Sequence, residues 1–213
     1  GPNITPDPET GIGRWREADF IRAMREGVAP DGSPYYPAFP FTSYTRMTDA
    51  DLRALKAYLD TVPAVRQTSR PHELAFPYNL RLGLWPWRWA FFTPARFVPD
   101  QARDEAWNRG AYLVEGPGHC QECHTPRTWS LSLDSARAFQ GGDLGPGIGK
   151  VPDITRHPER GLGQWTEDDY LFLLQLGMKP DGDFVGGDMA KIVTNGTAKL
   201  SEPERQAITR FLM

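Results

Sequence analysis

Two cysteines and a histidine form the most chemically specific run of this 213-residue chain, Cys120-Gln121-Glu122-Cys123-His124. The sequence contains no other cysteine. Residues three apart lie on one face of a helical turn, so the two thiols can each form a thioether with a vinyl group of one haem. His124 then reaches the iron as its proximal ligand. The motif predicts one covalently attached haem c.

Three other uses of a cysteine pair fit the sequence less well. A structural zinc site needs four ligands, usually two such pairs, and no second cysteine pair exists. A thioredoxin-like redox pair follows a strand in a βαβ pattern, which the sequence before Cys120 does not have. A disulfide between Cys120 and Cys123 would close a very small loop and stabilise the fold little.

The composition indicates a loop-rich protein with a partly aromatic core. The chain has 20 prolines, 21 glycines and seven tryptophans, and its length suits one large or two small domains. A covalent haem would supply an apolar centre to such a chain. The net charge of −3 argues against nucleic acid as a partner. No run of about 18 apolar residues occurs, so we expect no transmembrane segment.

An internal repeat divides the chain. Residues 2–32 align without a gap with residues 152–182, and 14 of the 31 positions are identical. The identical positions include a Gly-x-Gly-x-Trp run and a Pro-Asp-Gly turn. We infer two copies of one module, and we expect a first helix to open at Trp15-Arg16-Glu17 in one copy and at Trp165-Thr166-Glu167 in the other.

A second helix is expected to close each copy. Thr48 precedes one, with leucines at helical spacing behind it, and Ser201 with Glu204 forms a capping box before the other. The offset between these closing helices is 153, so the second copy carries three extra residues. We therefore predict an all-α fold of tandem class I cytochrome c-like modules.

The front half of a first module is not part of this sequence, because the counterpart of Cys120 would fall upstream of Gly1. Thioether attachment also implies export, yet no signal peptide is visible. We therefore expect a processed or trimmed chain, the alternative being a first module that has lost its haem-binding front. A second haem is expected only if the natural protein extends upstream. The expected divisions are residues 1–62, the back half of a first module; 63–103, a linker; and 104–213, the haem-bearing module.

The linker is rich in proline and aromatic residues. Its prolines prevent long regular helices, and its aromatic stripe comprises Trp85, Trp87, Trp89, Phe91 and Phe92. The stripe either packs between the modules or forms a docking surface for a partner subunit. Residues 104–113 then predict the helix that opens the second module.

The sixth iron ligand decides whether a haem carries electrons or has an open site. We expect Met189 as this ligand, in a glycine-rich loop from which the chain can fold back over the haem. Met178, which aligns with Val28, more simply serves packing. His157 and His119 are the other candidates, but His157 lies in a polar loop and His119 is too near the attachment turn.

The first copy offers no equivalent ligand. Phe39 or Tyr36 stands at the position that corresponds to Met189, and neither coordinates iron as methionine does. Met47 is the nearest methionine and aligns with Leu200. It is a candidate ligand for a first haem, with core packing as the alternative.

The runs GAYLVEGPGHCQECHTPR and GDFVGGDMAKIVTNGTAKLS resemble the diheme cytochrome c family, as do NITPDPETGIGRW and YPAFPFTSYTRMTDADLRALKAYL. The resemblance covers nearly the whole chain. It implies thioether anchors at Cys120 and Cys123 and an axial pair of His124 and Met189. This sequence departs from the family in lacking the first Cys-x-x-Cys-His motif, and Phe39 stands where some relatives have methionine.

The resemblance also implies a periplasmic electron-transfer protein, either free or associated with a membrane, rather than an enzyme. Its expected partners are the catalytic subunit of a dehydrogenase and a terminal oxidase or another cytochrome. One alternative is a haem enzyme with an open or labile sixth site, of the peroxidase or thiosulfate-oxidising type. Another is a haem-based sensor or a structural subunit that docks through the aromatic stripe.

Overall fold

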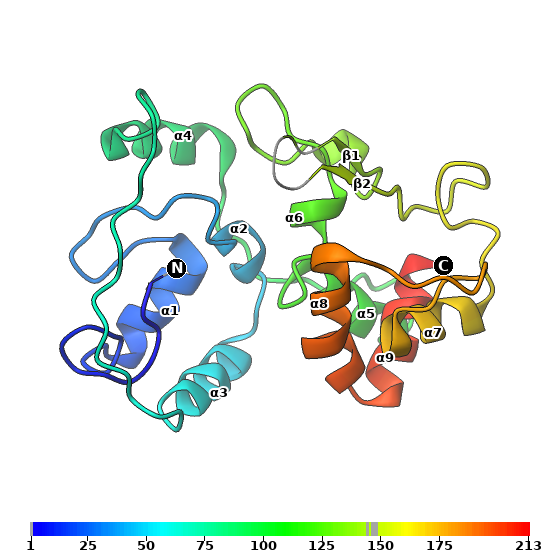
Figure 1. The fold of residues 1–213 in the computed structure, drawn as a ribbon, viewed down its shortest axis with the longest axis horizontal. Coiled ribbons are helices and arrows are strands. Elements are labelled where there is room, and N and C mark those ends of the chain that lie inside the picture. The colour runs from blue at the N-terminus through cyan, green and yellow to red at the C-terminus, as the bar shows by residue number, and fades with distance from the viewer. Residues whose placement is uncertain (1, 144, 146–148) are drawn as a thin grey trace. The chain divides into compact units, whose positions relative to one another are not determined.

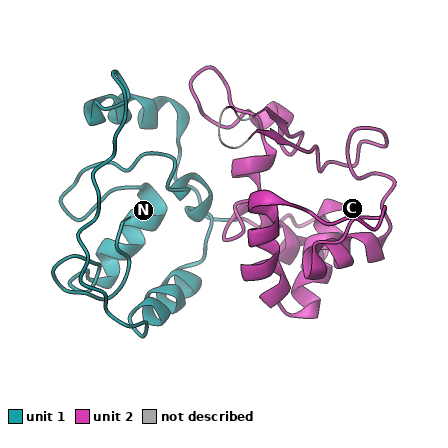
Figure 2. Cartoon of the chain, viewed as in Figure 1, with its two compact units in different colours: residues 1–97 teal, residues 98–213 magenta. Residues whose placement is uncertain are grey.

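The computed structural model describes residues 2–143, 145 and 149–213 of the chain. They form two compact units, residues 1–97 and residues 98–213 (Figure 2). Helices dominate both units. Among the described residues the only strands are β1 (Gly142–Asp143) and β2 (Lys150–Val151), which pair antiparallel with Gly142 opposite Val151. The structure is thus rich in helices with few strands, as the sequence predicts.

The first unit surrounds a small apolar core. Its elements are α1 (Glu17–Glu26), α2 (Phe41–Tyr44), α3 (Asp49–Leu59), the 3-10 helix η1 (Arg81–Gly83) and α4 (Leu84–Phe91). The core contains Leu52, which is fully buried, together with Ile12, Phe20, Met24 and Met47. Helices α1 and α3 supply most of these side chains, since each helix presents an apolar stripe at a spacing of three or four residues.

The second unit is built on the crossing of two helices. Its helical elements are α5 (Glu105–Glu115), α6 (Gln121–His124), η2 (Ser135–Arg137), α7 (Glu167–Leu176), α8 (Gly187–Asn195), η3 (Thr197–Lys199) and α9 (Glu202–Leu212). Helices α5 and α9 pack against each other along their length, and α7 contacts both α8 and α9 (Figure 1). Trp107 and Phe211 meet edge to face in the α5–α9 crossing, with ring centroids 5.1 Å apart.

The expected helix starts are present. Thr48 caps α3 by accepting a hydrogen bond from the Asp51 amide, and Ser201 with Glu204 forms the capping box of α9. Helix α7 has a similar capping box between Thr166 and Asp169. Each of these side chains satisfies amide groups that have no partner within the helix, so local sequence fixes where the helices begin.

The two repeated segments, residues 2–32 and 152–182, have the same local structure. Helices α1 and α7 end at Gly27 and Gly177, which both adopt the left-handed conformation. Each helix leads into a tight turn closed by an isolated bridge, Val28 with Pro34 in one unit and Met178 with Phe184 in the other. The two units thus share a loop, a helix and a turn. They differ afterwards, because the four-residue α2 has the nine-residue α8 as its counterpart.

Residues 63–97 belong to the first unit. Helix α4 tolerates Pro86 because the proline falls in its first turn, where amides have no helical partner. Arg88 is buried and donates to the Glu26 carbonyl, while Phe92 meets Phe41 edge to face at 4.9 Å. Arg88 thus ties α4 to the end of α1 and Phe92 of the aromatic stripe packs on α2, whereas Trp89 is 80% exposed. No described helix is long and apolar enough to span a membrane.

Candidate haem-binding site

The Cys-x-x-Cys-His run forms the single helical turn that its spacing predicts. Cys120 is the N-cap of α6, and its carbonyl accepts hydrogen bonds from the amides of Cys123 and His124 at 3.3 and 2.9 Å. The turn follows α5 directly, since the Cys120 amide donates to the Val114 carbonyl at 3.1 Å. Pro126 lies just beyond the turn and prevents its continuation. Both cysteines are free thiols.

His124 is oriented by a backbone carbonyl from a distant part of the chain. Its side chain is largely buried, and Nδ1 lies 3.0 Å from the Pro152 oxygen. A carbonyl can only accept, so Nδ1 carries the proton and Nε2 keeps its lone pair. Burial lowers the pKa of His124, while the bond to Pro152 acts in the opposite direction. The lowered pKa favours the neutral imidazole, the form that ligates iron.

The two thiols differ in environment. Burial raises the pKa of the Cys120 thiol to about 11. Cys123 is exposed at the surface; partial desolvation raises its pKa, the Glu122 carboxylate adds to this effect and the Arg127 guanidinium opposes it. The donor set fits a c-type haem: two thiols on one turn, followed by an imidazole whose Nδ1 is held by the Pro152 carbonyl.

Two contacts of the site were not foreseen in the sequence. The Pro152 carbonyl that orients His124 carries no sequence signal, because any residue in that loop would present the same group. Arg127 binds Glu122, a residue of the attachment turn itself, with Nη2 and Oε2 2.6 Å apart. Its position three residues after the motif was the available signal, since a basic side chain there can reach the last carbonyls of a helical turn.

Met189 lies in a helix, which corrects the expectation of a loop. Helix α8 begins at Gly187, so Met189 occupies its first turn and is half-buried. The neighbouring Asp188 lies close enough to the Cys123 thiol to raise its pKa. The start of α8 is thus near the attachment turn. Ile192 follows Met189 at helical spacing, so both side chains project from similar sides of α8.

The other ligand candidates occupy different settings. Met178 is half-buried beside the bridge to Phe184. His157 uses Nδ1 to accept from the amides of Glu159 and Arg160, at 3.2 and 3.1 Å. Its counterpart Asp7 does the same with its carboxylate, so the histidine replaces a loop-forming aspartate. His119 has a positive φ of 40° at the approach to the attachment turn.

In the first unit, the candidate residues serve packing. Met47 is buried in the apolar core beside Met24 and Leu52. Phe39 meets Tyr44 edge to face at 5.7 Å, and the Tyr36 hydroxyl donates to the Tyr78 carbonyl at 2.8 Å. None of these contacts resembles the arrangement around His124.

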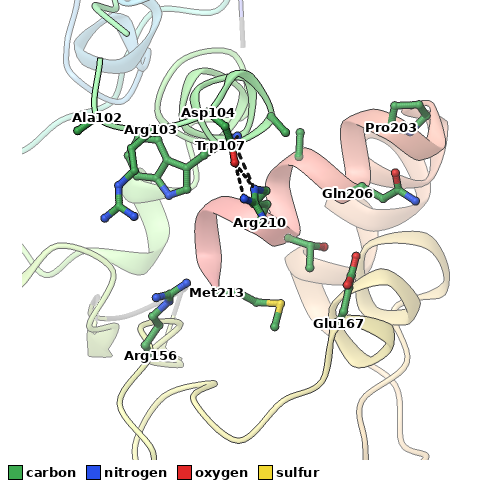
Figure 3. Close-up of a pocket in the computed structure, with 13 residues that line it drawn as sticks. Ala102, Arg103, Asp104, Trp107, Arg156, Glu167, Pro203, Gln206, Arg210 and Met213 are labelled. Atoms are coloured by element: carbon green, nitrogen blue, oxygen red, sulfur yellow. Dashed lines mark hydrogen bonds and ion pairs between the residues drawn. The ribbon is translucent and has the colours of Figure 1, made fainter. Parts of the chain in front are cut away.

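A groove of about 920 Å³ in the second unit lies between the start of α5 and the end of α9 (Figure 3). An ion pair between Asp104 and Arg210 crosses it, with Nε and Oδ2 2.9 Å apart. Trp107 lies beneath the Arg103 guanidinium at 5.1 Å from the ring centroid. The residues that line the groove include none of the residues of the attachment turn.

Comparison with known proteins identifies relatives over nearly the whole chain, although no protein-family model matches it. A diheme cytochrome c-type protein of Cereibacter sphaeroides is 43% identical over 211 residues, which cover 99% of this chain and 69% of that protein. A nicotinate dehydrogenase subunit of Pseudomonas putida is 39% identical, and the cytochrome c subunit of a quinone alcohol dehydrogenase of Gluconacetobacter polyoxogenes is 38% identical.

The match covers 99% of this chain in both dehydrogenase subunits, but only 17% and 46% of their own lengths. The Cereibacter protein is matched over more than two thirds of its length, at an identity well above that at which folds diverge. The attachment turn, the His124 side chain held by Pro152 and the relatives all indicate a c-type cytochrome. This chain belongs to the diheme cytochrome c family.

Proposed function

We propose that the chain is an electron-transfer subunit that carries one haem c, anchored at Cys120 and Cys123 and ligated by His124 and Met189. The observation that carries the proposal is the geometry of the attachment turn, where Pro152 holds the His124 imidazole in the tautomer that iron requires. A haem bound there supplies a one-electron Fe(III)/Fe(II) couple, whose potential a methionine sulfur raises.

The chain's own residues would position this group and expose it. Pro152 fixes His124 and excludes the competing tautomer, so ligation needs no rearrangement of the ring. Cys123 is exposed, so the haem edge attached there would reach the surface, where a redox partner can approach it. Electron transfer through a haem edge requires no substrate-binding group in this chain. Substrate chemistry would therefore belong to another subunit.

We place this subunit in the bacterial periplasm, with a dehydrogenase as electron donor and a respiratory acceptor such as a terminal oxidase or another cytochrome. The support is that relatives are named as subunits of nicotinate dehydrogenase and of a quinone alcohol dehydrogenase. Covalent haem attachment favours an exported protein. Held at a membrane or free, the subunit would act through its partner.

Haem content per chain tests the first part of the proposal. After acid–acetone extraction of the denatured protein, a pyridine haemochrome spectrum should give one haem per polypeptide, and none in a Cys120→Ser/Cys123→Ser variant. A chain extended upstream by a further Cys-x-x-Cys-His motif should give two. A wild-type chain without bound haem would overturn the proposal and would favour a thiol redox site at the two cysteines.

The distal ligand is tested with a matched pair of methionines. Met189→Leu should remove the absorption band typical of sulfur bound to ferric haem and lower the midpoint potential, because the sulfur ligand favours the ferrous state. Met178→Leu changes the same chemistry in the same unit at similar burial, and should leave both properties unchanged. A spectrum unaffected by Met189→Leu would favour the alternative of an open or labile sixth site.

A further inference from the structure

An ion pair is built into the attachment turn. Glu122 stands between the two haem-anchoring cysteines, and Arg127 Nη2 lies 2.6 Å from its Oε2 and 3.1 Å from its backbone oxygen. The Glu122 side chain is 10% exposed and that of Arg127 29% exposed. The guanidinium thus binds both the carboxylate and a carbonyl of the four-residue α6, whose last carbonyls have no helical partner.

The loop after the turn holds Arg127 in place. Residue 127 forms an isolated bridge with Leu133, and the Thr128 amide donates to the Ser132 carbonyl at 2.9 Å. A second guanidinium nitrogen, Nη1, lies 3.4 Å from the Leu131 carbonyl. The Arg127 backbone and both terminal nitrogens are already held, so the side chain loses little conformational entropy when it pairs with Glu122. An ordinary surface arginine loses more.

The two charges balance each other beside the haem site. Glu122 directly precedes Cys123 in the chain and Arg127 binds its carboxylate, so both charges lie beside the sulfur where a thioether would form. Because both side chains are mostly buried, solvent and salt screen them less than an exposed pair. A carboxylate alone would stabilise the ferric state of a nearby haem, whereas a guanidinium alone would stabilise the ferrous state.

We propose that the Arg127–Glu122 pair is a positioning and charge-balancing element of the haem site, which shapes the attachment turn and sets the midpoint potential. This inference rests on the proposed function. Loss of Arg127 would remove a positive charge from the haem site and lower the potential. Loss of Glu122 would remove a negative charge and raise the potential.

A charge cycle tests the proposal in the haem-loaded protein. Midpoint potentials are measured by spectroelectrochemistry for the wild type, Arg127→Gln, Glu122→Gln and the double variant. The single variants should shift in opposite directions, each by roughly tenfold in the reduction equilibrium, or about 59 mV for one electron. The double variant should return close to the wild type, and the shifts should persist at high salt.

Two controls separate this role from general stability. Arg127→Lys keeps the charge and should restore most of the potential. Arg109→Gln breaks another Arg–Glu pair of the second unit, 2.7 Å from Glu204 across α5 and α9, and should leave the potential unchanged. Single variants that shift in the same direction, or not at all, would overturn the inference.

The outcomes remain distinct from those of the proposed function. A wild-type chain that binds no haem contradicts that function, whereas a haem-loaded wild type with potentials unchanged in every variant contradicts only the role of the pair. If Arg127→Gln attaches no haem, the double variant decides. Recovery of attachment there would support the negative charge of Glu122 as the cause, and continued failure would overturn the charge-balancing role.

Discussion

Cys120 and Cys123 are alike in type but not in reactivity. The thiolate is the reactive form of cysteine, and a pKa of about 11 keeps the Cys120 thiol protonated across the neutral range. In the folded chain before haem attachment, iodoacetamide should therefore label the exposed Cys123 before Cys120. The labelling rate of Cys120 should rise with pH until about pH 11, whereas an unfolded cysteine levels off near its ordinary pKa of about 8.5.

Peptide sequencing by mass spectrometry after timed labelling checks this order. Chain unfolded in urea is the control, in which both thiols should react at similar rates. Equal rates in the folded chain would contradict the different burial of the two sulfurs.

At this scale the sequence was informative only where side-chain chemistry is specific. The spacing of Cys120, Cys123 and His124 predicted their helical turn, which the structure confirms, whereas haem attachment at these residues stays a prediction. The Pro152 carbonyl could not be predicted, because a backbone group 28 residues away has no identity in sequence. The contact between Arg127 and Glu122 depends on how a short loop folds back, which residue types alone do not determine.

Helices α5 and α9 cross at Gly110, where no side chain fits. A Cβ at this position would collide with the Ala207 carbonyl oxygen, and the Phe211 Cβ would lie 2.9 Å away. Gly110→Ala should therefore push the helices apart and lower the free energy of unfolding by roughly 1–3 kcal/mol or more, as overpacked cores do. Urea unfolding followed by circular dichroism measures the loss.

Gly83→Ala is the matched control for this crossing. A Cβ at Gly83 would have no neighbour within 4 Å, so stability should change little. A Gly110→Ala variant as stable as the wild type would show that α9 moves aside without cost.

The cap of α3 provides a second test at the level of elements. Thr48 Oγ1 accepts a hydrogen bond from the Asp51 amide at 3.0 Å. Thr48→Ala should leave that amide without its partner and cost about 1 kcal/mol of unfolding free energy. Thr48→Ser keeps the hydroxyl and should retain most of the stability. Thermal unfolding of both variants decides, since equal losses would point to the threonine methyl group rather than the cap.

Element starts were predictable because caps act locally, through side chains within three residues of the amides they bind. The start of α8 was not. Gly186 and Gly187 suggested a loop around Met189, yet the helix begins at Gly187. The apolar spacing of Met189, Ile192 and Val193 was the better guide, since Val193 is buried by packing that the glycines do not reveal.

Each unit of the molecule has its own apolar core. Leu52 is fully buried within the first unit, where it packs with Phe20, Met24 and Met47. Leu52→Ala should destabilise that unit by roughly 2–5 kcal/mol, the usual cost of truncating a buried leucine. The haem absorbance reports on the second unit, and its thermal transition should keep the wild-type midpoint.

Comparing the far-ultraviolet circular dichroism with the haem absorbance during one thermal scan separates the two units. Leu55→Ala, at a half-buried position of the same helix, should give a smaller loss. If both signals shifted together in Leu52→Ala, the units would unfold as one cooperative body rather than independently.

The sequence predicted residues 63–103 as a linker, but it did not show which residues they contact. Residues 63–97 belong to the first unit and contact its earlier part through pairs such as Tyr36 with Tyr78, 42 residues apart, and Phe41 with Phe92. Contacts between residues so far apart in the chain depend on tertiary packing, and they leave no periodic pattern in the sequence.

The shared loop, helix and turn of the two units have a consequence for how such a chain can be rebuilt. Gly11 and Gly161 both lie so close to a threonine carbonyl, Thr5 or Thr155, that no side chain fits. Among the identities between residues 2–32 and 152–182, these glycines thus mark positions where the backbone leaves no room for a side chain. The two segments are equal in length and end in the same Pro-Asp-Gly turn, so each could replace the other in a chimeric chain. Exchanging them should preserve the path of the backbone, and only the buried side chains would need refitting.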